Sequence, residues 1–383
     1  MTVDAGLLDA VRARLAEAGA SPTPAEVARV LRRDGTLVGD TSVLDVVDAL
    51  RRDSIGAGPL DPLLTEPGVT DVLVNGADHV YIDRGGGLEL TDVRFTDDEA
   101  VRRLAQRLAA MAGRRLDDAS PYVDVRLADG SRLHAVLAPV SRPGTCVSLR
   151  LPARRAMTFD ELVAARSLSS AGADVLRDLV AARVAFLVSG GTGSGKTTLL
   201  AALLSMVPDR ERIVIVEDAT ELRPRHPHVV SLEARQANVE GVGEIPLRVL
   251  VRQALRMRPD RLVVGEVRGA EVVDMLAAMN TGHEGGCGTL HANSAVDVPA
   301  RLEALAVAAG LPRGAVHAQV SAAVQAIVHL RRGRSGQRRV SGIAVIERRE
   351  DGLVDALPAL DFGGDCPTLG PGAARLETLL VGG

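Results

Sequence analysis

The sequence predicts an α/β protein with a parallel sheet in its C-terminal half, preceded by a smaller α+β domain and a helical N-terminal extension. From residue 183 onward, short apolar runs alternate with helical segments, which is the pattern of a parallel sheet with crossover helices. Between residues 60 and 151, short strands and turn signals surround one amphipathic helix. A chain of 383 residues, of which 46% are hydrophobic, is long enough to fill two cores.

Residues 1–55 are predicted to form the helical extension, because apolar side chains recur there at helical spacing. Leu7, Val11 and Leu15 follow this spacing before a proline-containing break. A second helix is expected from Pro24 to about Arg33, and a third from Ser42 to Arg52. This segment carries no catalytic signal.

Residues 60–151 are predicted to form the α+β domain. Asn75-Gly76 and Asp129-Gly130 each join two short apolar runs, as the turns of β-hairpins do. Residues 97–113 have the apolar periodicity of a helix. Four arginines of this domain have two interpretations, a solvated strand face or a contact with phosphate across a domain or subunit boundary: Arg126, Arg132, Arg142 and Arg150.

Residues 152–182 are expected to form a linker and leading helices, and residues 183–360 the large α/β domain. The tail, residues 361–383, is rich in glycine and proline and is expected to be flexible. The strands predicted for the large domain are Val184–Val188, Ile213–Glu217, Val229–Glu233, Leu262–Val267, Gly288–His291 and Ile327–Arg331, with Ile343–Glu347 as an edge strand.

A phosphate-binding loop is predicted directly after the first of these strands. The segment GGTGSGKT fits the pattern G-x-x-x-x-G-K-[ST] and stands between an apolar strand and a helix. Glycines allow backbone N–H groups to surround phosphate oxygens, and the helix N-terminus adds its dipole. Lys196 would reach the β- and γ-phosphates, and the Thr197 hydroxyl would ligate Mg²⁺. The residues predicted to bind nucleotide are Gly190, Gly191, Thr192, Gly193, Ser194, Gly195, Lys196, Thr197 and Thr198.

Lys196 is the only lysine among the 45 basic residues of the chain. Everywhere else the sequence uses arginine for a positive charge. A compact ammonium on a flexible stem fits a tight phosphate cradle that a planar guanidinium does not. The alternative, a glycine-rich turn without a ligand, does not explain why the one lysine stands at this position.

Two acidic segments fit the carboxylates that handle metal and water beside a phosphate loop. Ile213–Glu217 is an apolar strand that ends in a carboxylate, and Glu217 is therefore a candidate metal ligand. Leu262–Val267 resembles the second nucleotide motif, Walker B, but Gly265 stands where the usual aspartate would be. Glu266 is then the candidate for polarising the attacking water. Solvated strand-end carboxylates are the alternative for both residues.

Two histidines mark a further segment, TGHEGGCGTLHANS. His283 lies in its glycine-rich part and His291 at the end of the strand that follows. Histidines in such a loop indicate a sensor of the γ-phosphate or a link to motion, because the glycines allow the loop to move. A structural histidine is the plainer alternative for either one.

Composition excludes several other classes of protein. The net charge of −4 and the scarcity of aromatic residues, with no tryptophan, argue against direct nucleic-acid binding. Three distant cysteines form neither a disulfide framework nor a zinc motif. No apolar run reaches about eighteen residues, and the N-terminus lacks a basic start. We therefore expect a cytoplasmic protein with at most peripheral membrane contact.

Together, four motifs resemble those of the ATPases that power type II secretion, type IV pili and type IV secretion. They are the Walker A loop, IVIVEDATEL as the Asp box, RMRPDRLVVGEVRGAE as the Walker B segment, and TGHEGGCGTLHANS as the His box. The segments DVLVNG and VRLADGSRLH most resemble the sequences of the tight-adherence (Tad) pilus branch. The four-cysteine zinc insertion of type II secretion ATPases is missing.

The resemblance implies a RecA-like P-loop ATPase domain that works with ATP and Mg²⁺ in a homo-hexameric ring. It also implies a position at the inner face of the cell membrane, under an inner-membrane platform protein. Lys196, Thr197, Glu217, Glu266 and His291 take the phosphate, metal, water and sensor roles by this resemblance. Arg132 and Arg150 are implied to reach phosphate from the N-terminal domain.

Three functions remain open on the sequence. The first is a motor for pilus assembly or for type II/IV-like protein secretion. The second is a conjugation-type ATPase that supports DNA or protein transfer. The third is a scaffold that binds ATP with little turnover. A cluster of arginines near the C-terminal end of the large domain is interpreted either as a solvated hairpin tip or as a contact with acidic lipid or a partner: Arg331, Arg332, Arg334, Arg338 and Arg339.

Overall fold

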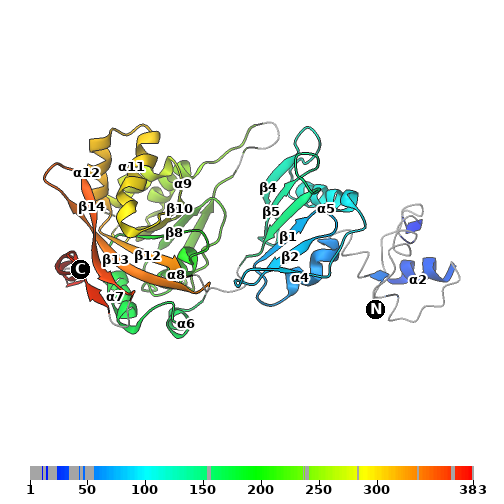
Figure 1. The fold of residues 1–383 in the computed structure, drawn as a ribbon. Coiled ribbons are helices and arrows are strands. Elements are labelled where there is room, and N and C mark those ends of the chain that lie inside the picture. The colour runs from blue at the N-terminus through cyan, green and yellow to red at the C-terminus, as the bar shows by residue number, and fades with distance from the viewer. Residues whose placement is uncertain are drawn as a thin grey trace. The chain divides into compact units, whose positions relative to one another are not determined.

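The structure, a computed structural model, consists of two compact units, Met1–Pro152 and Ala153–Gly383 (Figure 1). It describes residues 11, 14–15, 24–33, 43, 46–47, 56–152, 157–235, 237, 241–282, 284–333, 336–363 and 367–381. The second unit begins close to the predicted domain boundary, and it includes the segment predicted as a linker with leading helices. That segment forms helices α6 (Phe159–Ala164) and α7 (Ser170–Ala181).

The N-terminal extension contains helix α2, which spans Pro24–Arg33 as the sequence predicts. Val27, Val30 and Leu31 are buried on one side of α2, because they are spaced three or four residues apart. They belong to a small apolar cluster with Val11, Leu15, Val43 and Val46. Most of the other two predicted helices lies outside the described residues.

The rest of the first unit is a six-stranded antiparallel sheet packed against helix α5 (Asp98–Met111), as an α+β domain requires. Asp97 caps α5, because its side chain accepts a hydrogen bond from Ala100 N. The sheet order is β3-β2-β1-β6-β5-β4. Its strands are β1 (Asp71–Asn75), β2 (Val80–Asp83), β3 (Leu88–Leu90), β4 (Tyr122–Arg126), β5 (Arg132–Val136) and β6 (Cys146–Arg150).

The second unit is built on a nine-stranded sheet with the order β15-β14-β13-β12-β7-β11-β10-β8-β9. The strands from β12 to β9 pair in parallel, and those from β12 to β15 pair antiparallel. The parallel strands are β7 (Phe186–Gly190), β8 (Ile213–Glu217), β9 (Val229–Glu233), β10 (Arg261–Val267), β11 (Cys287–Leu290) and β12 (Ala326–Arg332).

Helices cover both faces of this sheet (Figure 1). Alternate residues of one strand enter different cores, so that Val188 packs with α6, α7 and α8 (Lys196–Leu204) and Leu187 packs with the helices opposite. Because both faces are covered, β7 and β8 are buried at every residue, which explains the apolar runs at residues 186–188 and 213–216. The opposite helices are α9 (Leu247–Ala254), α10 (Glu271–Met279), α11 (Val298–Ala308) and α12 (Arg313–Ala323).

The C-terminal segment corrects two predictions. The strand predicted at the sheet edge is β13 (Arg338–Arg348), which lies inside the sheet because β14 (Val354–Asp361) pairs beside it. The tail predicted to be flexible forms β15 (Thr368–Leu369) and α13 (Ala373–Val381). Leu376 of α13 is 3% exposed within the core that contains α7, so apolar burial holds this segment despite its glycines and prolines. Among the described residues, no helix is long and apolar enough to cross a membrane.

Candidate functional site

The glycine-rich loop predicted to bind phosphate joins β7 to α8 at the C-terminal edge of the parallel sheet. Gly193 and Gly195 have positive φ values of 68° and 95°, which other residues rarely adopt. A Cβ atom on Gly190 would lie 2.6 Å from the Leu330 carbonyl oxygen, so only glycine allows the strands to approach so closely. The buried Ser194 hydroxyl has no hydrogen-bond partner among the described residues. The loop therefore has the backbone of a phosphate cradle.

Lys196, the only lysine, is 7% exposed and lies inside this loop. Its Nζ donates hydrogen bonds to the carbonyl oxygens of Gly190 and Gly191, each at 3.1 Å. These are neutral acceptors for a buried cation, and an anionic phosphate would be a stronger partner. Thr197 and Thr198 follow in the first turn of α8 and are half-buried.

His291 connects Lys196 to a carboxylate. Its Nδ1 lies 3.3 Å from Lys196 Nζ, and its Nε2 lies 2.5 Å from Glu266 Oε1. Burial and the Lys196 ammonium lower the pKa of His291, while Glu266 opposes them in part. A neutral ring fits these contacts in one tautomer, in which Nδ1 accepts from the ammonium and the protonated Nε2 lies beside the carboxylate. The close contact with Glu266 Oε1 does not have the geometry of a hydrogen bond.

Glu266 lies on β10 and contacts two cationic or donor groups, His291 and the guanidinium of Arg268. Burial raises the pKa of Glu266, but Arg268, His291 and Lys196 outweigh it and hold the pKa below the usual value. Glu266 is therefore ionised at neutral pH. Sequence reasoning did not assign a role to Arg268. The signal that identifies it is its spacing, because side chains two residues apart along an extended segment share a face.

Glu217 occupies the space that Gly265 leaves open. β8 and β10 pair in parallel up to Val216 and Val264, so the next residue of each strand lies at the same level. A Cβ atom on Gly265 would lie 2.4 Å from Glu217 Cγ. The missing Walker B aspartate therefore has a physical explanation, because the carboxylate at this place comes from the neighbouring strand instead.

The Glu217 carboxylate is buried, and only one of its two oxygens accepts hydrogen bonds within the described residues. It is 4% exposed, and its Oε1 accepts hydrogen bonds from Glu221 N at 3.1 Å and Leu222 N at 3.0 Å. Its Oε2 is buried without a hydrogen-bond partner among the described residues. Burial raises the pKa of Glu217 from 4.5 to about 7. A cation or an ordered water would relieve this desolvation.

We expect Glu217→Gln to stabilise the free protein more at pH 8 than at pH 4.5. In wild type, the unfolded chain releases the Glu217 proton as pH rises above 4.5, while the folded chain keeps it up to about pH 7. Folding stability is therefore lost over this interval, by about 3 kcal/mol for a shift of this size. The substituted glutamine does not titrate, so the variant avoids the loss. Melting temperatures across this pH range, measured in EDTA without nucleotide, test the expectation.

Glu233→Gln is the matched control. Glu233 ends the neighbouring strand β9 opposite Glu217, but it is exposed and bonds to Thr220. The Glu233 variant should keep most of the wild-type pH dependence, because burial is the largest cause of the raised Glu217 pKa and the Glu233 charge only adds to it. A Glu217 variant that melts in parallel with wild type at every pH would contradict the buried, proton-holding carboxylate.

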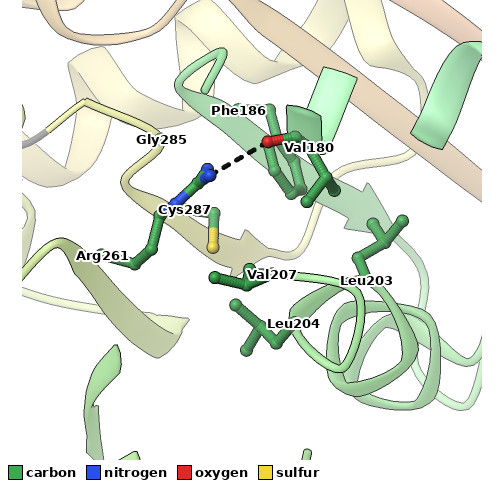
Figure 2. A pocket seen from close by; sticks show the side chains of 8 residues that line it. All are labelled: Val180, Phe186, Leu203, Leu204, Val207, Arg261, Gly285 and Cys287. Atoms are coloured by element: carbon green, nitrogen blue, oxygen red, sulfur yellow. Dashed lines mark hydrogen bonds between the residues drawn. The ribbon is translucent and has the colours of Figure 1, made fainter. Parts of the chain in front are cut away.

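A buried ion pair supports the loop that precedes His291. Arg261 is 2% exposed, and its Nε donates to Glu211 Oε2 at 2.6 Å. Its Nη2 donates to the Val180 carbonyl oxygen at 3.0 Å, and the guanidinium lies against Gly285 (Figure 2). A Cβ atom on Gly285 would lie 2.0 Å from Arg261 Nη1. The cavity here, of about 10 Å³, has room for one water and lies at the edge of the sheet opposite the phosphate loop.

The residues fit a magnesium nucleotide in their donor types. Backbone N–H groups of the loop, the α8 N-terminus and Lys196 suit phosphate oxygens, while Thr197 and Glu217 carry oxygen atoms of the kind that Mg²⁺ prefers. No group of three or more His, Cys, Asp or Glu side chains in the described part of the chain forms a complete metal site. Mg²⁺ in nucleotide sites keeps several waters and takes ligands from substrate phosphates.

The structure thus brings together Lys196, Thr197, Glu217, Glu266 and His291 at one edge of one sheet. His283 lies outside the described residues. Arg132 and Arg150 belong to the other unit, where they lie opposite each other on β5 and β6. Arg132 pairs with Asp124, with Nε donating to Oδ1 at 2.8 Å. Their approach to phosphate remains a prediction.

Comparisons with known proteins identify the family of the chain. The family model described as type II/IV secretion system protein matches residues 53–350. The chain is 57% identical over 327 residues to MT3759 of Mycobacterium tuberculosis, whose name associates it with conjugal transfer; the match covers 84% of this chain and 93% of that protein. It is 34% identical to the type IV secretion system protein PtlH of Bordetella pertussis, over 74% of this chain and 92% of PtlH.

Two solved structures share the fold. The pilus retraction motor PilT, with bound ADP, matches with a TM-score of 0.52 and 20% identity over 84% of each chain. The ATPase DotB of Yersinia pseudotuberculosis matches with a TM-score of 0.53 and 16% identity, over 88% of this chain and 84% of DotB. These likenesses confirm the predicted fold class. With 298 of its 383 residues inside the family match, the chain belongs to the type II/IV secretion system protein family.

Proposed function

We propose that the chain hydrolyses MgATP and uses the energy to drive a pilus-assembly or secretion machine. The contact chain Lys196–His291–Glu266 carries this proposal, because it links the ammonium of the phosphate loop to an ionised carboxylate. A site that only held nucleotide would need the loop and the lysine. A carboxylate held beside them by a histidine and an arginine adds the means to orient a water molecule for attack.

Each residue has a distinct role in this proposal. Lys196 leaves the carbonyls of Gly190 and Gly191 and binds the β- and γ-phosphates. Thr197 and Glu217 would hold Mg²⁺, which neutralises charge on the phosphates when it is bound. Glu266 accepts a hydrogen bond from the attacking water and orients it. Phosphate release ends with Lys196 returning to its carbonyl acceptors.

His291 is proposed to sense the γ-phosphate through hydrogen bonding. Its Nδ1 accepts from Lys196 in the structure, so an ammonium that turns toward phosphate leaves the ring without that donor. The ring can then shift and change the position of Glu266, which it contacts through Nε2. His291 would thus transmit the presence of phosphate to the carboxylate that orients water.

The proposed working form is a homo-hexameric ring under an inner-membrane platform protein, at the cytoplasmic face of the membrane. Arg132 and Arg150 would supply positive charge to phosphate from the N-terminal unit. Membership of the Tad pilus branch is proposed because the segments DVLVNG and VRLADGSRLH resemble those of that branch. Conjugation-type transfer is the second candidate, favoured by MT3759 and by the conjugal transfer protein TrbB of Rhizobium radiobacter, which is 31% identical over 77% of this chain and 89% of TrbB.

A dilution series tests the ring. We expect ATP turnover per chain to rise with protein concentration as the mass measured in parallel changes from monomer to hexamer. This follows if arginines from one subunit complete the site of another. Full turnover from a monomer, unchanged on concentration, would contradict the shared site and leave hydrolysis as a property of the single chain.

A further inference from the structure

Four arginines form two cross-strand pairs at the end of the β12–β13 hairpin. Arg332 lies directly opposite Arg338, and Arg331 lies opposite Arg339. All four side chains are exposed. Like charges directly opposite each other destabilise a sheet. This concentration of positive charge therefore favours an anion from outside the chain.

One of the two pairs lies against the phosphate loop. A Cβ atom on Gly193 would lie 3.6 Å from Arg332 Nη1, and one on Gly195 would lie 3.5 Å from Arg338 Cδ. The contact follows from the sheet order, because β12 pairs in parallel with β7 and continues two residues past the level of Gly190.

The other pair faces away from the loop. Side chains alternate along a strand, and Leu330 and Val340 belong to the core that contains α8. Arg332 follows Leu330 by two residues and Arg338 precedes Val340 by two residues. Both arginines therefore lie on that same face. Arg331 and Arg339 are therefore on the opposite face of the same hairpin. Arg331 and Arg339 thus form a control pair that has the same charge and is also exposed but lies on the other face.

Arg332 and Arg338 lie on the side of the phosphate loop that is away from the hydrolytic groups His291 and Glu266. β7 has β11 on one side, with β10 beyond it, and β12 on the other. His291 and Glu266 belong to the β11–β10 side. A nucleotide that lies across the loop with its terminal phosphate toward Glu266 would extend its α-phosphate and nucleoside toward β12.

We propose that Arg332 and Arg338 bind the α- and β-phosphates of a nucleoside di- or triphosphate from within the same subunit. The inference rests on the proposed function, since it uses the same phosphate loop. Guanidinium groups suit this task because they present several donors to phosphate oxygens. ADP and ATP share these two phosphates, so the pair strengthens the binding of both and does not alter the hydrolytic step.

The test compares two double variants of the full chain, Arg332→Gln/Arg338→Gln and Arg331→Gln/Arg339→Gln. Dissociation constants are measured for MgADP and for a non-hydrolysable MgATP analogue, and turnover is measured at saturating ATP. For the first variant we expect both constants to rise about tenfold, as for loss of charge-assisted hydrogen bonds at a partly solvated site, with turnover retained. For the second we expect wild-type constants. Melting curves without nucleotide verify that both variants fold.

Three results would overturn the inference. They are wild-type affinity in the Arg332/Arg338 variant, an equal loss in both variants, and a loss for the ATP analogue alone. An equal loss would indicate a general effect of surface charge, and a loss for the analogue alone would place the arginines at the γ-phosphate. Wild-type protein that binds neither nucleotide would instead remove the proposed function itself, and this inference with it.

Discussion

Glu266→Gln is expected to lower the rate of ATP turnover by about 10²–10⁴-fold while MgATP binding is retained. Glutamine keeps the size of the side chain and one oxygen acceptor but loses the negative charge that orients and polarises water. The phosphate loop and Lys196 are unchanged, so the dissociation constant of a non-hydrolysable MgATP analogue should stay within a few-fold of wild type. Steady-state phosphate release and analogue titration separate the two quantities.

Glu233→Gln serves again as control, because it removes a strand-end carboxylate of the same sheet away from the loop. It should leave turnover near wild type. If Glu266→Gln hydrolyses ATP as fast as wild type, Glu266 does not orient the attacking water. If wild type itself binds MgATP but does not hydrolyse it, the scaffold function becomes the better description.

Lys196→Ala is expected to abolish the thermal stabilisation that MgATP confers. A ligand present at one hundred times its dissociation constant stabilises the folded state by about 2.7 kcal/mol. For a unit of this size that corresponds to a rise of about 5–10 °C in melting temperature. The alanine variant has no ammonium for the phosphates, so its melting temperature should be the same with and without MgATP.

Lys196→Arg distinguishes the ammonium from simple positive charge. Lys196 is 7% exposed and contacts the carbonyls of Gly190 and Gly191, an arrangement that suits a compact ammonium better than a planar guanidinium. We therefore expect the arginine variant to lose the stabilisation as well. An alanine variant that MgATP stabilises as strongly as wild type would show that the nucleotide binds elsewhere.

Several parts of the site could be predicted from sequence because they are local. The pattern GGTGSGKT contains its own strand–loop–helix context, and α8 begins at Lys196 as that context requires. Glu217 and Glu266 stand at the ends of apolar runs, and the C-terminal ends of parallel strands meet at one edge of a sheet. Their convergence follows from the topology alone.

Other features of the site and the fold depend on which strands lie side by side, and strand order cannot be predicted from local sequence patterns. Gly265 is unusual in the sequence, but its reason becomes visible only when Glu217 of β8 is placed beside it. Arg332 and Arg338 stand in a basic cluster that the sequence does not connect with the phosphate loop, and only the pairing of β12 with β7 places them beside it. The tail was predicted to be flexible from its glycines and prolines, while the burial of Leu376 against a distant core decides its structure.

The most direct measurement is phosphate release from ATP by the wild-type chain, first with excess Mg²⁺ and then after EDTA is added. It is made at a concentration where the mass shows the assembled form. We expect steady release with Mg²⁺ and none after the metal is removed, because Thr197 and Glu217 would position the phosphates only through the cation. No release with Mg²⁺, although MgATP stabilises the protein, would contradict the proposal that this chain is an ATP-driven motor.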